Sequence, residues 1–79
     1  MRAVRRLGRT PAELGNTTGV SGSPDIIELD DGSIGVIGTD ITDELGRQPL
    51  RDARCAPDER IVRIPRNTLL HAAKDVLES

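Results

Sequence analysis

The chain has 79 residues, a formal net charge of −2, one cysteine, one histidine and no Phe, Tyr or Trp. A lone cysteine excludes an internal disulfide, and one Cys with one His cannot complete a tetrahedral metal site. No apolar run reaches the roughly 18 residues of a membrane span. The composition therefore predicts a small protein without metal or cofactor, whose all-aliphatic core needs support from a second copy or a bound partner.

The first 24 residues are expected to form a basic arm and a flexible linker ahead of a single domain over residues 25–79. Residues 1–9 carry no acid and four arginines: Arg2, Arg5, Arg6 and Arg9. Residues 15–24 are rich in Gly, Ser, Thr, Asn and Pro, as linkers are. Residues 10–13 combine a hydroxyl N-cap, a proline and a carboxylate three positions on, which predicts a single helical turn.

A strongly acidic block follows the basic arm. Residues 24–45 hold seven carboxylates and no basic side chain. Three interpretations stay open: a charged surface for a partner, two halves of the chain that attract each other, or separate solvated faces.

Residues 25–39 predict a β-hairpin. The Asp-Gly pair at 31–32 suits a two-residue turn, because both central positions of such a turn need positive φ. In the register that this turn sets, apolar residues of both strands share one face. The expected pairs are Leu29 with Ile34 and Ile27 with Val36.

Further elements complete the predicted fold. A short helix starts at Thr42, a long loop covers residues 46–59, and a third strand covers residues 59–64. An amphipathic helix over residues 67–78 is expected to bury an apolar stripe of Leu69, Leu70, Ala73, Val76 and Leu77. The predicted fold class is α+β: a small antiparallel three-stranded sheet, made of hairpin 25–39 and strand 59–64, with helix 67–78 packed on it.

Several short motifs occur in a fixed order along most of the chain. They are Gly8-Arg9-Thr10-Pro11-Ala12-Glu13-Leu14-Gly15, Pro24-Asp25-Ile26 with Glu28-Leu29, Val36-Ile37-Gly38-Thr39-Asp40 with Thr42, Asp58-Glu59-Arg60-Ile61-Val62, and Arg66 with Thr68-Leu69-Leu70. This order resembles a family of small uncharacterised proteins common in high-GC soil bacteria. The resemblance implies no activity. It implies a small cytoplasmic accessory or regulatory protein that acts beside a helix-turn-helix regulator.

Cys55 and an acidic cluster are the two candidate chemical sites. Neighbouring cations lower the pKa of a thiol, and three arginines lie near Cys55 in sequence: Arg51, Arg54 and Arg60. Cys55 is therefore either an inert thiol or a redox-active one that forms an intermolecular disulfide. The acidic cluster either binds a hard cation or caps local turns; it comprises Asp40, Asp43 and Glu44. His71 lies on the polar side of the last helix, together with Lys74, Asp75 and Glu78, and is expected to be solvated.

No motif pairs a base with a nucleophile, so an enzyme is not expected. The favoured function is a protein-interaction or regulatory accessory module, homodimeric or bound to a partner protein, that docks through an exposed sheet edge. The alternative is a DNA-binding antitoxin or transcriptional regulator that uses its arginine-rich arm. Seven arginines form the candidate interaction surface: Arg2, Arg5, Arg6, Arg9, Arg60, Arg63 and Arg66. A free thiol and no recognisable export signal predict a cytoplasmic protein without a membrane partner.

Overall fold

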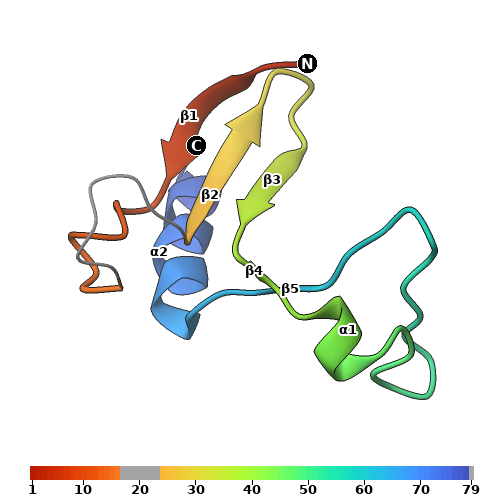
Figure 1. Cartoon of the computed structure of the whole chain (residues 1–79). Coiled ribbons are helices and arrows are strands. Elements are labelled where there is room, and N and C mark those ends of the chain that lie inside the picture. Colours follow the sequence, from red (N-terminus) through yellow and green to blue (C-terminus); the bar gives the residue numbers. More distant parts are fainter. Residues whose placement is uncertain (17–23, 79) are drawn as a thin grey trace.

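The computed structural model describes residues 1–16 and 24–78 and has the predicted α+β architecture (Figure 1). An antiparallel sheet with strand order β1-β2-β3 carries helix α2 on one face. The elements are β1 (Ala3–Leu7), β2 (Asp25–Leu29), β3 (Ile34–Ile37) and α2 (Arg66–Glu78). The prediction of a three-stranded antiparallel sheet with the C-terminal helix packed on it is confirmed.

The third strand of this sheet is β1, so the prediction that residues 59–64 supply it is wrong. Ala3–Leu7 of the expected basic arm pairs with β2, and Leu7, the last residue of β1, is only 1% exposed. Opposite charges on paired strands attract each other, and the arginines of β1 meet carboxylates of β2. Within residues 59–64, only Val62–Arg63 is a strand (β5), and it pairs with β4 (Thr39–Asp40) in a separate two-stranded sheet.

The hairpin of β2 and β3 is confirmed, but its predicted register is wrong by one residue. The loop has three residues, 30–32, because Leu29 N–H donates to the Ser33 carbonyl (2.9 Å). Gly32 has a φ of 87°, as the last residue of a three-residue hairpin loop requires. The observed pairs are Ile26 with Val36, Ile27 with Gly35, and Glu28 with Ile34.

Helix α2 contacts the sheet through small side chains. Thr68 and Ala72, one turn apart, are 3% and 2% exposed, and Ala72 forms the core with Leu7 and Ile26. The predicted apolar stripe is not buried against the sheet, because its largest members stay exposed: Leu69, Leu70, Val76 and Leu77.

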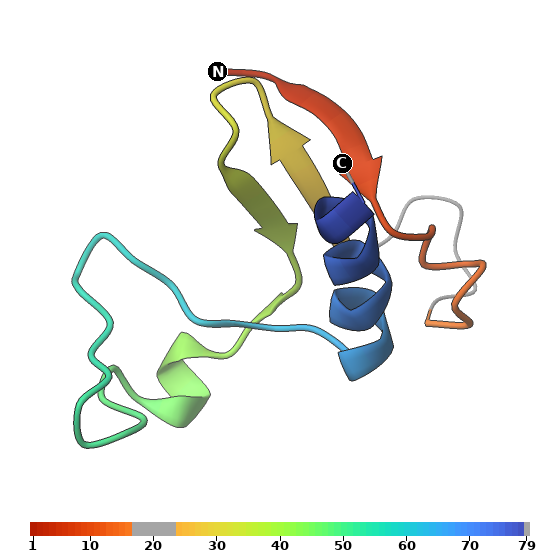
Figure 2. The same cartoon turned by 180° about the vertical axis from the view of Figure 1, so that it is seen from behind.

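A second lobe extends away from the sheet, as Figures 1 and 2 show. It contains β4, β5, the predicted short helix α1 (Thr42–Leu45), which is confirmed, and the loop after it. Thr42 anchors the lobe: its hydroxyl accepts the N–H of Ile61 at 2.7 Å, and the residue is 1% exposed. The radius of gyration is 13.6 Å, against about 11.6 Å for a compact domain of this length.

The single turn predicted near residue 10 is confirmed as a capping box. The hydroxyl of Thr10 accepts the N–H of Glu13, and the Glu13 carboxylate accepts the N–H of Thr10. The side chain of Asn16 then donates to Asn67 and Thr68, which ties this turn to the start of α2. The linker predicted for residues 15–24 falls mostly on residues 17–23, which lie outside the described residues.

We predict that alanine at Gly8 destabilises the protein more than alanine at Gly15. Both glycines have positive φ (83° and 71°), so both substitutions strain the backbone. A Cβ at Gly8 would also lie 2.8 Å from the backbone N of Ala72, whereas nothing lies within 4 Å at Gly15. In urea denaturation, Gly8→Ala should lower the free energy of unfolding by about 1–3 kcal/mol more than Gly15→Ala. Equal losses would contradict the close packing of α2 on β1.

Candidate functional site

An apolar groove lies between β3 and α2. It has a volume of about 350 Å³, and its lining is almost entirely hydrophobic. The floor includes the buried core residues, and the walls are formed by exposed aliphatic side chains, among them Ile34, Val36, Leu69 and Leu77. Ordinary surface leucines and isoleucines are scattered singly, whereas a continuous apolar patch marks an interaction site.

The groove exists because α2 lies over β1 and β2 and leaves β3 uncovered. Figure 2 shows β3 beside the helix rather than beneath it. As a result, Ile34 and Val36 stay 47% and 44% exposed, although they share the sheet face with buried Leu7 and Ile26.

The free edge of β3 presents the backbone groups of Ile34 and Val36. Leu29 and Ser33 form a hydrogen-bonded pair, and such pairs alternate along an antiparallel ladder. The N–H and C=O groups of Ile34 and Val36 therefore point away from β2. In the described part of the chain, β3 is paired on its β2 side alone.

The opposite edge of the sheet, formed by β1, is built differently. Its register shifts between Ala3 and Arg5, which is a bulge or irregularity. Arg5 pairs with Glu28 at 3.1 Å, and Arg6 pairs with Asp25 at 2.8 Å. Bulges and charged side chains are the usual means by which proteins prevent strand addition at an edge.

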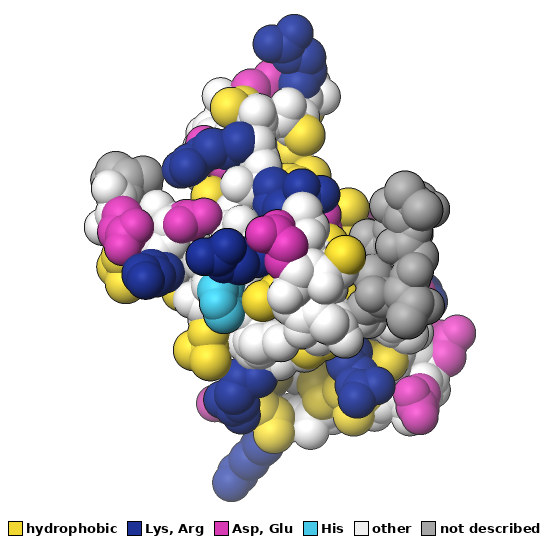
Figure 3. Space-filling model, turned by 90° about the vertical axis from the view of Figure 1, so that its left-hand side faces the viewer, with side chains coloured by type: hydrophobic (Ala, Val, Ile, Leu, Met, Phe, Trp, Pro, Cys, Tyr) yellow, Lys and Arg dark blue, Asp and Glu magenta, His cyan; other side chains and the backbone are white. Residues whose placement is uncertain are grey.

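The structure does not gather the seven arginines into one surface. Arg5 and Arg6 point to opposite faces of the sheet, and four of the seven are ion-paired: Arg5, Arg6, Arg9 with Glu13, and Arg60 with Asp40. Arg2, Arg63 and Arg66 form no ion pair with the described residues. On the face that Figure 3 presents, basic and acidic side chains are interspersed.

Cys55 is enclosed by the loop of the second lobe, at 9% exposure. Its backbone N–H donates to the Arg47 carbonyl at 2.7 Å, and its Sγ lies 3.6 Å from Nη1 of Arg47. The same Nη1 donates to the carbonyls of Ala56 and Glu59, so Arg47 holds both ends of the loop. The sequence had indicated Arg51, Arg54 and Arg60 as the cations near the thiol. Arg47 lies eight residues away, and no local pattern predicts its contact with Cys55. The redox role of Cys55 stays a prediction.

The acidic cluster is used within the second lobe. The Asp40 carboxylate accepts the Thr42 N–H and the Arg60 guanidinium, and these contacts lower the pKa of Asp40 to about 2. Asp43 lies 3.9 Å from Arg60. Among residues 1–16 and 24–78, no three Cys, His, Asp or Glu side chains are grouped as metal ligands.

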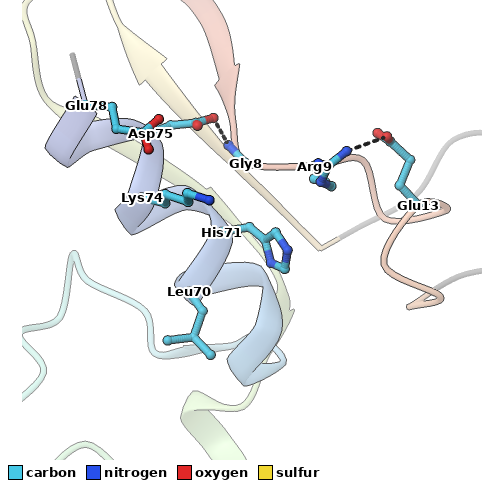
Figure 4. A pocket seen from close by; sticks show the side chains of 8 residues that line it. All are labelled: Gly8, Arg9, Glu13, Leu70, His71, Lys74, Asp75 and Glu78. Carbon is cyan, nitrogen blue, oxygen red and sulfur yellow. Dashed lines mark hydrogen bonds and ion pairs between the residues drawn. The ribbon is translucent and has the colours of Figure 1, made fainter.

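Another hollow, of mixed charge and about 520 Å³ in volume, lies between α2 and the segment after β1 (Figure 4). His71 lines it and is half-buried, with Nδ1 3.1 Å from the Asn67 carbonyl. Asp75, expected on the solvated side of the helix, accepts the backbone N–H of Gly8 at 2.7 Å. Asp75 is therefore a structural anchor between α2 and β1.

Comparisons of the chain with protein-family models, with curated proteins and with solved structures gave no match. The family resemblance therefore stays a hypothesis. Neither described helix has the length and apolar character that crossing a membrane requires.

We predict that the Asp40 contacts make stability depend on pH between about 4 and 2. The pKa of Asp40 falls from 3.8 to about 2 in the folded chain, so its stabilisation is complete above the unfolded value and lost as pH falls through this window. Asp40→Asn should therefore be less stable than wild type at pH 7, with a difference that shrinks towards pH 2 in urea titrations. A difference for Asp40→Asn that stays constant as the pH falls would contradict the assignment.

We predict that Arg47 limits access to the Cys55 thiol. Each charge-assisted hydrogen bond to a carbonyl contributes about 1.5–3 kcal/mol, so Arg47→Gln should favour loop opening. Labelling of Cys55 by a thiol reagent should accelerate by roughly tenfold or more in this variant. Arg54→Gln, which removes only an exposed 3.5 Å contact to Gln48, should label at the wild-type rate. Fast labelling of the wild type would contradict an enclosed thiol.

Proposed function

We propose that this chain is a small non-enzymatic protein-interaction module, a cytoplasmic regulatory accessory that binds a protein through the β3–α2 groove and the adjoining β3 edge. The observation that carries the proposal is the groove itself, an almost purely apolar surface next to a β3 edge that no other described strand pairs. Apolar burial supplies affinity, and main-chain hydrogen bonds to an added strand supply alignment.

The size of the core supports the same conclusion. Among the described residues, the buried cluster consists of Leu7, Ile26 and Ala72, with Ile64 packed against it. A fully buried aliphatic side chain contributes about 1.5–3 kcal/mol to folding stability. The exposed side chains of the groove would make this contribution when a bound protein covers them. Binding to the folded state would raise the stability of the domain.

DNA binding ranks second because of the ion pairs. A phosphate contact by Arg5, Arg6, Arg9 or Arg60 would have to replace a carboxylate contact that the fold already makes. The Arg6–Asp25 contact is bidentate, because Nε donates to Oδ1 and Nη2 to Oδ2, and the Asp25 side chain is only 8% exposed. Such pairs are the strongest of their kind.

The proposal is tested by capture of partners from the native cell with a tagged chain. The double variant Leu69→Asp/Leu77→Asp places two charges in the groove, on side chains that are 55% and 84% exposed and can be changed without emptying the core. Recovery of a protein partner, including untagged copies of the chain itself, should fall by about tenfold or more. Circular dichroism establishes that the variant is folded.

The matched control is Leu50→Asp, a leucine that is 65% exposed in the loop of the second lobe. It should retain the partner at the wild-type level. A partner that stays bound to the groove variant, or that Leu50→Asp releases equally, would contradict the proposal.

A further inference from the structure

We infer that the protein bound at the β3 edge is a second copy of this chain, joined by antiparallel pairing of the two β3 strands about a two-fold axis at Gly35. The inference rests on the proposed function and names its partner. Four observations lead to it: the direction of the backbone groups, the chemistry of the strand, the asymmetry between the two sheet edges and the extent of exposed surface.

The backbone direction determines the register. Ile34 and Val36 turn their N–H and C=O groups outward, whereas Gly35 exchanges hydrogen bonds with Ile27. When two β3 strands run antiparallel about Gly35, Ile34 of one copy lies opposite Val36 of the other. Both pairs are of the hydrogen-bonded type, which gives four intermolecular main-chain bonds.

The side chains of β3 suit this arrangement. Residues 33–38 carry no charge and no proline. The two Gly35 residues form the central non-hydrogen-bonded pair, where opposing Cα atoms approach to about 4.5 Å, and neither has a side chain to collide. On the groove face, Ile34 and Val36 of both copies form two β-branched cross-strand pairs. The two grooves then join into one apolar trough flanked by both α2 helices.

The two edges of the sheet explain why assembly stops at two copies. Pairing of β3 with β1 of another molecule would be head-to-tail and would propagate into a filament. The bulge and the arginines of β1 oppose it. Pairing of the β3 strands of two copies is isologous and closed, so neither β3 edge remains free to bind a third copy.

The chain also has surface available for such an interface. A compact monomer of 8.5 kDa exposes roughly 4,700 Å², whereas this chain exposes 6004 Å². A stable interface covers about 800 Å² per partner, an area that the groove and the β3 edge together would have to supply. The net charge of −2 per copy adds little repulsion.

The first test compares one substitution on the two edge strands. Val36→Lys places a charge opposite the apolar Ile34 of the other copy, whereas Val4→Lys places it on β1, where the residue is 59% exposed. Sedimentation over a concentration series should show dimers for wild type and Val4→Lys. For Val36→Lys, the dimer Kd should rise by roughly tenfold or more. Circular dichroism of each variant establishes that it is folded.

The second test reads the register directly by crosslinking. In a Cys55→Ser background, Gly35→Cys should form a covalent dimer under mild oxidation, because opposing Cα atoms lie within disulfide reach. The new Cβ would meet only the tip of Ile27, at 3.0 and 3.3 Å, and Leu29 at 3.7 Å, all movable side chains. Ser33→Cys is the control: its two copies would be about 14 Å apart and should stay uncrosslinked.

The outcomes separate this inference from the proposed function. A monomeric wild type, a dimer insensitive to Val36→Lys, or crosslinking at position 33 instead of 35 would overturn the β3 dimer. If the groove variant nevertheless loses a different protein in the capture experiment, the interaction module stands and its partner is that protein. If the wild type is monomeric and the groove variant still captures every protein that the wild type captures, both the dimer and the interaction module are overturned.

Discussion

The close approach of α2 to the end of β1 is the contact on which the arrangement of the whole sheet face depends. Gly8 lets the two backbones meet, since a Cβ there would lie 2.8 Å from the Ala72 nitrogen. The Gly8 N–H, which β2 does not use, donates to Asp75, and an unpaired buried donor at this point would cost about 1–3 kcal/mol. Small residues on α2, Thr68 and Ala72, complete the contact.

The position of the helix has a direct consequence for the surface. Because α2 is held against β1 by its small residues, its leucines are not buried against the sheet. One helix is about 10 Å wide and strands are about 4.8 Å apart, so a helix centred over β1 and β2 cannot also cover β3. The exposed groove is therefore a geometric result of the Gly8–Ala72 packing, and the exposure of Ile34 and Val36 follows from it.

Local sequence patterns were sufficient for the elements that depend on residues within four positions of one another. The capping box at Thr10, helix α1, the hairpin and helix α2 all follow from such patterns. The hairpin register did not, because it depends on whether the turn has two or three residues. Asp30 is the deciding residue: it leaves the β2–β3 ladder, and its N–H donates to the carbonyl of Arg2, just before β1. No local signal reports a partner that lies 28 positions earlier in the chain.

The wrong prediction of the third strand and the unexpected role of Asp75 have the same physical cause. Charge complementarity between residues 1–9 and 24–45 was visible in the sequence, and the interpretation in which two halves attract each other is the one that β1 and β2 realise. The pattern alone could not distinguish attraction within the chain from attraction to a partner. Asp75 was equally ambiguous, since a carboxylate on a polar helix side is ordinarily solvated; only the fold brings it to Gly8.

Whether a residue is used within the fold or is left available to a partner also decides where a binding surface can lie. The charged residues that the sequence offers as a binding surface largely form ion pairs within the fold. The arginines of β1 pair with carboxylates of β2 and protect the β1 edge of the sheet. The residues left available are uncharged and aliphatic, and they had been assigned to the core. A chain without aromatics lacks the large side chains that usually close a small core, so part of its apolar surface remains outside. The surface that we propose to bind a partner is thus the apolar face of the sheet that one helix is too narrow to cover.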